Sequence, residues 1–150
     1  MVQRCTNPSN HAWPEYGGAG ITVADRWFCS VGGSFENFLI DLGERPEGTT
    51  LDRWPNPDGP YAPGNTQWST PEQQARHTGP QKNGASSQYK GVSWNRRDGK
   101  WYARIQPARC VRYLGSFNDE KHAARAYDTA ALEAWGADAW LNAEHFDLAA

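Results

Sequence analysis

The chain of 150 residues is long enough for one large domain or two small ones, and its net charge of −2 excludes no class of partner by itself. Its apolar stretches are far shorter than the roughly 20 residues of a membrane-spanning helix, and no signal sequence follows Met1, so we expect a cytoplasmic protein with no membrane partner. Three scattered cysteines, Cys5, Cys29 and Cys110, exclude a disulfide framework or a CxxC metal site.

The first predicted elements have an irregular pattern of apolar residues. Residues 16–23 read as a glycine turn that leads into a strand. Residues 25–42 predict a helix that Gly32 and Gly33 interrupt. Its expected buried stripe consists of Trp27, Phe35, Phe38, Leu39 and Leu42.

The next elements follow the order strand, loop, strand, helix. We predict strands at 49–54 and 65–68, a Pro- and Gly-rich loop at 55–64, and a short helix at 71–77. This is the order of the ββα unit of metal-dependent nucleases. Residues 4–77 also resemble phage and mobile-element proteins of the HNH type, which often carry an appended AP2 domain; the matching motifs include Tyr16-Gly17-Gly18, Ser34-Phe35-Glu36-Asn37-Phe38 and Leu51-Asp52-Arg53.

The HNH resemblance implies a catalytic set of Asp52, Arg53, Asn65 and His77. Asp52 and His77 are the expected ligands of a divalent metal, Mg²⁺ or Mn²⁺, and Asn65 is expected to orient a partner across the hairpin. Arg53 stands where the general-base His is expected, and a guanidinium cannot accept a proton near neutrality. We therefore expect Arg53 to clamp a phosphate and any DNA nicking to be weak, and the enzyme question stays open.

Residues 78–87 predict a flexible linker, because they have two glycines and no apolar periodicity. The linker divides the chain into an HNH-like domain at 1–77 and a second domain at 88–150.

The second domain predicts three strands and one helix, so that the whole chain belongs to the α+β class. Strands are expected at 89–94, 101–105 and 111–117, with a hairpin turn at Asp98-Gly99. A helix with Asn118 as its N-cap runs to Gly136. We expect it to lie close on the sheet through small residues and one ring, namely Ala123, Ala126, Ala130, Ala134 and Tyr127.

The charge of this domain is concentrated in residues 87–117, where seven Lys or Arg residues and one acid, Asp98, give a net charge of +6. Alternation along 101–105 places Trp101, Ala103 and Ile105 on a buried face, and it places Lys100, Tyr102, Arg104 and Gln106 on a polar face. A basic sheet face is typical of a surface that meets phosphate, and a merely solvated charged face is the alternative.

Residues 87–142 are similar to the AP2/ERF DNA-binding domain. The similarity rests on five ordered blocks: Tyr89-Lys90-Gly91-Val92, 99–105, 113–117, 123–131, and Gly136 with Leu141-Asn142. It implies that the exposed sheet face docks in the DNA major groove through Lys90, Ser93, Asn95, Arg97, Arg104, Gln106, Val111 and Tyr113. Charge adds Arg96 and Lys100 to these expected DNA contacts.

Departures from the AP2/ERF pattern limit what carries over. Ser93, Arg104 and Tyr113 stand where plant members have Arg, Glu and Trp, so no target site is inherited. Arg112 stands where an inward apolar residue is usual, and we expect its side chain to snorkel or the strand to shift. Trp94 is expected at the edge of the DNA face, unlike the other tryptophans.

Together these patterns predict a double-stranded DNA-binding protein of phage or mobile-element type, resembling HNH-AP2 homing endonucleases. Two alternatives remain open: a regulator without catalysis, and a phage-encoded inhibitor that binds a host nucleoprotein complex.

Overall fold

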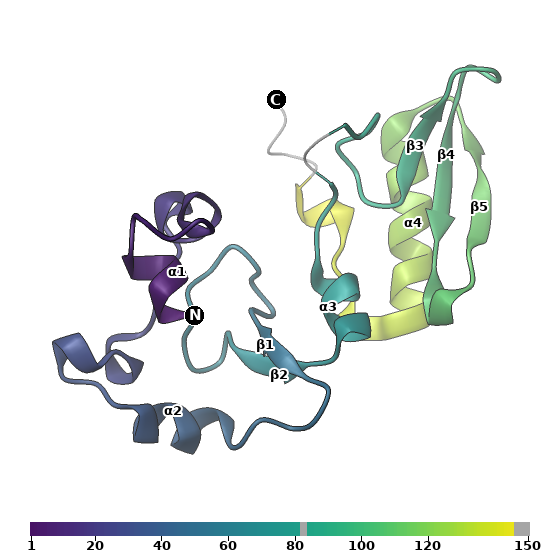
Figure 1. Ribbon diagram of the computed structural model, residues 1–150. Coiled ribbons are helices and arrows are strands. Elements are labelled where there is room, and N and C mark those ends of the chain that lie inside the picture. Colours follow the sequence, from purple (N-terminus) through teal and green to yellow (C-terminus); the bar gives the residue numbers. More distant parts are fainter. Residues whose placement is uncertain (82–83, 146–150) are drawn as a thin grey trace. The chain divides into compact units, whose positions relative to one another are not determined.

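The chain divides into two units, Met1–Ala75 and Arg76–Ala150, in a computed structural model that describes residues 1–81 and 84–145 (Figure 1). The segment 78–87, expected as a linker, falls within the C-terminal unit. Its residues 82–83 lie outside the described residues, as do residues 146–150 of the expected C-terminal domain. Along the described part of the chain, no helix combines the length and apolar character needed to cross a membrane.

The N-terminal unit has two α-helices, one small hairpin and most of a third α-helix. Helix α1 covers Val2–Thr6 and helix α2 covers Phe35–Leu42. Strands β1 (Thr50–Asp52) and β2 (Gln67–Ser69) pair antiparallel, and helix α3 (Pro71–His77) follows, so the expected order of strand, loop, strand and helix is present.

The expected long helix at 25–42 is wrong in its first half. Residues Asp25–Trp27 and Cys29–Val31 form two 3₁₀ turns, and α2 begins only after Ser34, whose Oγ accepts a hydrogen bond from the Asn37 amide. A Cβ on Gly33 would lie 2.1 Å from the Asp25 carbonyl oxygen, so the chain folds back at this glycine instead of continuing a helix. Phe35 is consequently 61% exposed and outside the expected stripe.

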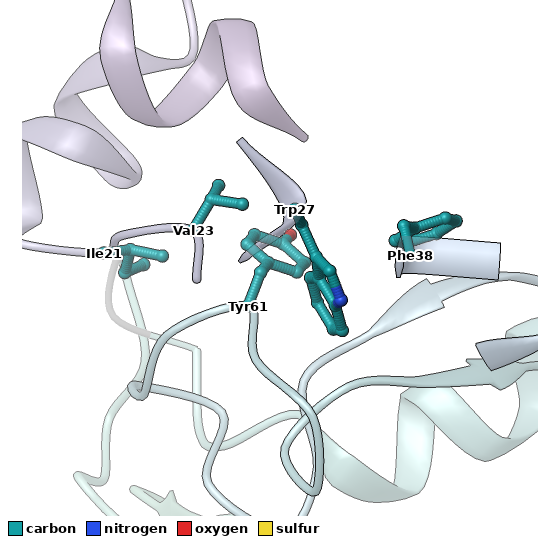
Figure 2. Packing of buried hydrophobic residues seen from close by; sticks show 5 residues of the cluster. All are labelled: Ile21, Val23, Trp27, Phe38 and Tyr61. Carbon is teal, nitrogen blue, oxygen red and sulfur yellow. The ribbon is translucent and has the colours of Figure 1, made fainter. Parts of the chain in front are cut away.

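The core of the N-terminal unit consists of Ile21, Val23, Trp27, Phe38 and Tyr61 (Figure 2). Trp27 and Phe38 meet edge to face with ring centroids 5.3 Å apart. The strand expected up to residue 23 is reduced to one parallel bridge between Val23 and Tyr61. Large rings from distant segments therefore hold a unit that has little regular structure.

The C-terminal unit is the expected antiparallel sheet packed on a long helix, which confirms the α+β class and an AP2-like fold. Strands β3 (Val92–Asn95), β4 (Lys100–Ile105) and β5 (Arg112–Phe117) lie in the order β3-β4-β5. Helix α4 spans Glu120–Trp135 (Figure 1).

Helix α4 begins and packs slightly differently from the prediction. Its N-cap is Asp119, one residue after Asn118, and the Asp119 carboxylate accepts a hydrogen bond from the His122 amide at 2.9 Å. The helix ends before Gly136, as expected. Ala134 is exposed, and the buried small residues are Ala123, Ala124, Ala130 and Ala131.

Candidate nucleic-acid interface

The sheet has one face against α4 and one exposed face. Ala103 and Ile105 of β4 are buried, and they pack with helix residues. Because side chains alternate along a strand, Tyr102 and Arg104 lie on the opposite face. The pairings Ser93 with Tyr102 and Arg104 with Tyr113 extend that face across the sheet. We call this surface the exposed sheet face; it comprises Ser93, Asn95, Lys100, Tyr102, Arg104, Tyr113 and Ser116.

Contacts between neighbouring strands order the centre of the exposed sheet face. The Arg104 Nη2 donates a hydrogen bond to Ser93 Oγ at 3.3 Å. The rings of Tyr102 and Tyr113 meet edge to face at 5.2 Å, and Tyr113 remains 53% exposed. Arg104 and Tyr113 pair across β4 and β5, and both are therefore exposed side chains that a neighbouring strand holds in place.

The β3–β4 turn presents two arginines. Asn95 Oδ1 accepts hydrogen bonds from the amides of Arg97 and Asp98 at 2.9 and 3.3 Å, so the Asn95 side chain shapes the turn. Arg96 and Arg97 are exposed. Among the described residues, no hydrogen bond or ion pair engages either guanidinium, so both are available to a ligand.

Asp98 is the acid of this basic surface, and its neighbours bind it. Asp98 Oδ2 accepts hydrogen bonds from Asn95 Nδ2 and from the Tyr102 hydroxyl. The bond to the Asp98 carboxylate raises the pKa of Tyr102. Neither Tyr102 nor Asp98 was among the expected site residues, although the same alternation that selected Arg104 also selects Tyr102.

Lys90, an expected DNA contact, has its ammonium group bound within the C-terminal unit. Its Nζ donates to the Arg76 carbonyl oxygen at 2.7 Å, and burial lowers the pKa of Lys90 to about 8. Its main-chain N–H donates to Asn142 Oδ1 at 2.7 Å, and Asn142 in turn is held by Asp128. Lys90 thus joins the start of the unit to Asn142, which follows α4 in the chain and is anchored to it by Asp128.

The remaining expected contacts are at the sheet margins. Gln106 is exposed directly after β4, and Val111 is 63% exposed directly before β5. The expectation for Trp94 is wrong: it pairs with Trp101 on the face that packs α4, with ring centroids 5.0 Å apart. The physical reason is the two-residue period, which gives Trp94 the same side as Val92.

The side chain of Arg112 snorkels, which is one of the two alternatives expected from the sequence. Its Nη2 lies 3.4 Å from Glu133 Oε2 on α4, and both side chains are more than half exposed. The guanidinium therefore reaches past the core edge to a helix carboxylate, instead of adding to the exposed sheet face.

Two of the expected catalytic residues, Arg53 and Asn65, form hydrogen bonds with the loop 55–64. Arg53 Nη1 donates to the Gly59 carbonyl oxygen at 3.0 Å, and its guanidinium carbon lies 5.2 Å from the Tyr61 ring centroid. Asn65 Oδ1 accepts from the Asn56 amide at 2.8 Å, and Asn65 Nδ2 donates to the carbonyl oxygens of Asn56 and Pro60. Asp52 ends β1 opposite Gln67.

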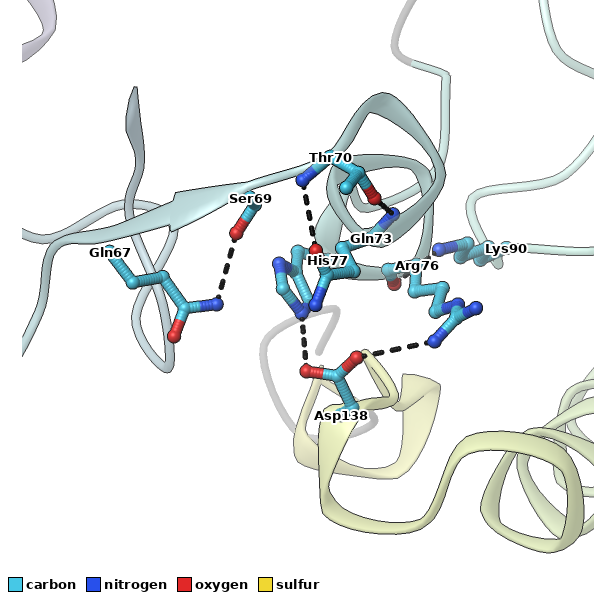
Figure 3. Close-up of polar contacts among 8 residues, drawn as sticks. All are labelled: Gln67, Ser69, Thr70, Gln73, Arg76, His77, Lys90 and Asp138. Atoms are coloured by element: carbon cyan, nitrogen blue, oxygen red, sulfur yellow. Dashed lines mark hydrogen bonds and ion pairs between the residues drawn. The ribbon is translucent and has the colours of Figure 1, made fainter. Parts of the chain in front are cut away.

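His77 belongs to the C-terminal unit and is 1% exposed. Its Nε2 lies 2.8 Å from Asp138 Oδ1, and Arg76 Nη1 lies 3.4 Å from Asp138 Oδ2 (Figure 3). Within the described ranges 1–81 and 84–145, no three His, Cys, Asp or Glu residues group as metal ligands. The shared metal of Asp52 and His77 stays a prediction.

No family model matches the chain. Over 57 residues it is 46% identical to APETALA2-like protein 2 of Oryza sativa subsp. indica and to the AP2-like ethylene-responsive transcription factor TOE2 of Arabidopsis thaliana. Over 73 residues it is 45% identical to dehydration-responsive element-binding protein 2E of Oryza sativa subsp. japonica. These matches cover 38%, 38% and 47% of this chain, and 13%, 12% and 22% of the relatives.

The chain therefore contains an AP2/ERF-like domain over roughly 40% of its length, and it spans less than a quarter of the curated relatives it matches. The comparisons give no support to the HNH resemblance or to a phage or mobile-element role.

Proposed function

We propose that the chain binds double-stranded DNA through the exposed sheet face and the β3–β4 turn. The observation that carries the proposal is the set of four exposed cations there: Arg96, Arg97, Lys100 and Arg104. Among the described residues none of the four has an ion-pair partner. Uncompensated cations on one ordered surface attract the phosphates of a duplex and release its counterions.

The shape of the surface also suits a duplex. The B-DNA major groove is about 12 Å wide and admits two strands of a sheet. Arg104 lies at the centre of the face, where its free N–H groups match the acceptor pair of a guanine. Tyr113, next to it, offers a ring edge and a hydroxyl. We infer that these two residues read bases, while Arg96, Arg97 and Lys100 contact phosphates.

A salt titration of binding to a short duplex tests this function. The logarithm of the affinity falls with the logarithm of the salt concentration by about 0.9 for each phosphate contact. The double variant Arg97→Ala, Arg104→Ala should bind DNA more weakly and show a flatter slope. The slope should fall by about 2 if both residues contact phosphate, or by about 1 if Arg104 contacts only bases. Lys121→Ala with Arg125→Ala removes the same charge from α4 and should leave the slope unchanged. Equal slopes for the two double variants would refute the assigned surface.

Metal-dependent cleavage is a separate hypothesis. The order of β1, β2 and α3 agrees with it, and no group of three His, Cys, Asp or Glu ligands lies within the described residues. We therefore derive no cleavage step. The test is to incubate the protein with supercoiled plasmid and either Mg²⁺ or Mn²⁺, with the Asp52→Ala variant as control. We expect the protein to retard the plasmid in a gel without nicking it. Nicking that Asp52→Ala abolishes would restore the nuclease hypothesis, and loss of retardation would favour a protein partner.

A further inference from the structure

Two arginines of the N-terminal unit converge on one pair of tyrosines. Arg4 comes from α1, and its guanidinium carbon lies 4.3 Å from the Tyr16 ring centroid. Arg53 follows β1, and its guanidinium carbon lies 5.4 Å from the same ring and 5.2 Å from the Tyr61 ring. Segments far apart in the sequence thus bring two positive charges to one place.

The hydrogen bonds of this cluster leave donors in excess. Arg4 donates to the hydroxyl oxygens of Tyr16 at 3.0 Å and Tyr61 at 3.3 Å, and Arg53 donates to the Gly59 carbonyl at 3.0 Å. All three acceptors are neutral. A guanidinium has five N–H groups, and a phenol that accepts a hydrogen bond still has its own O–H to donate.

No carboxylate compensates the two charges within the described residues. Arg26 differs, because its Nε lies 3.0 Å from Asp41 Oδ2, and Arg45 differs because it is exposed to solvent. Arg4 and Arg53 are half-buried, and partial burial makes an uncompensated charge costly unless an anion pairs with it.

The pKa values of neighbouring groups also indicate that both arginines act on this cluster. Burial raises the pKa of Tyr61 and of Cys5, and in both cases Arg4 and Arg53 act in the opposite direction. Both guanidiniums therefore act on the same small volume, although residues 1–75 have four arginines against nine acidic residues.

We propose that Arg4 and Arg53 form a binding site for a phosphate oxyanion, with the Tyr16 hydroxyl as a further donor. Paired guanidinium groups match the geometry of tetrahedral oxyanions. The oxyanion comes either from a DNA backbone or from free phosphate. The site lies outside the exposed sheet face and does not depend on the proposed function.

Titration of the full chain with inorganic phosphate at constant ionic strength tests the site, followed by the arginine Nε–Hε signals in NMR spectra. The Arg4 and Arg53 signals should shift together, while those of Arg26 and Arg45 stay in place. Phosphate should also raise the melting temperature. Arg4→Gln with Arg53→Gln should abolish this rise, whereas Arg26→Gln with Arg45→Gln should preserve it. Signals of the wild type that do not move with phosphate would overturn the proposal, whatever the stability of the variants.

The source of the phosphate is tested in the Arg97→Ala and Arg104→Ala background, which disables the exposed sheet face. If added duplex still shifts the Arg4 and Arg53 signals, the site holds a DNA phosphate. If only inorganic phosphate shifts them, the site holds a free phosphate. Failure of the sheet variants to weaken DNA binding would refute the proposed function and leave this site standing.

Discussion

Gly91 lies directly against the ring of Tyr127. A Cβ at position 91 would be 2.0 Å from Tyr127 Cδ2 and 2.6 Å from the Arg104 carbonyl oxygen, and Gly91 has a φ of +74°. The Gly91 carbonyl also accepts a hydrogen bond from the Arg104 amide at 2.8 Å. One glycine thus sets the distance between α4 and the strand that carries the central cation of the exposed sheet face.

Gly91→Ala should destabilise the C-terminal unit strongly, because the methyl group overlaps a buried ring and the backbone conformation is strained. We expect a loss of about 3 kcal/mol or more in the free energy of unfolding, measured by urea denaturation. Gly99→Ala is the control, since Gly99 has a φ of +60° and open space around it, and it should cost only about 1 kcal/mol. An equal loss of unfolding free energy in the two variants would show that the Tyr127 ring moves to accommodate the methyl group.

Lys90 should make stability rise with pH in the alkaline range. Burial lowers the pKa of Lys90 from 10.5 to about 8, so the folded state loses this proton first. Between about pH 8 and pH 10.5 the unfolded state binds more protons, and stability increases with pH. Lys90→Met should reduce this increase, whereas Lys121→Met, at an exposed position of α4, should not. The check is the difference in unfolding free energy between variant and wild type across that range.

The contacts of His77 predict where the C-terminal unit begins. A fragment of residues 76–150 keeps the buried His77–Asp138 contact and the bond from Lys90 Nζ to Arg76, and a fragment of residues 88–150 lacks both. We expect the longer fragment to be more stable by about 2 kcal/mol. His77→Ala in the longer fragment should remove much of that difference. Thermal unfolding of the three proteins is the measurement, and equal stability would place the start of the unit after the expected linker.

Arg112→Leu should be close to neutral. The ion pair with Glu133 is exposed on both sides, and such pairs contribute about 0–1 kcal/mol. A leucine restores an apolar residue on the side that faces the core, so the two effects nearly cancel. DNA affinity should also stay unchanged, because Arg112 is not on the exposed sheet face. A large loss of affinity would assign Arg112 to the interface.

The sequence was most informative where one local rule decides the structure. Alternation located the buried and exposed sides of β4, and Gly136 marked the end of α4. The sequence was less informative where contacts between residues far apart in the chain decide the structure. The sequence pattern predicts Lys90 as a DNA contact and His77 as a metal ligand, and it does not predict that Lys90 binds Arg76 and that His77 contacts Asp138 in the fold. Likewise, the approach of Gly33 to Asp25 stops the expected helix through a contact that no helical period contains.

The register shift between Ala103 and Arg104 has a consequence for sequence alignment. It makes Leu114 an extra residue of β5, so that Tyr113 faces outward and Arg112 faces α4. A homologue that lacks this extra residue would keep both orientations, because regular alternation from the position of Gly115 then places Tyr113 outward and Arg112 inward. An alignment that places its gap elsewhere in β5 would therefore equate an outward residue of one protein with an inward residue of another.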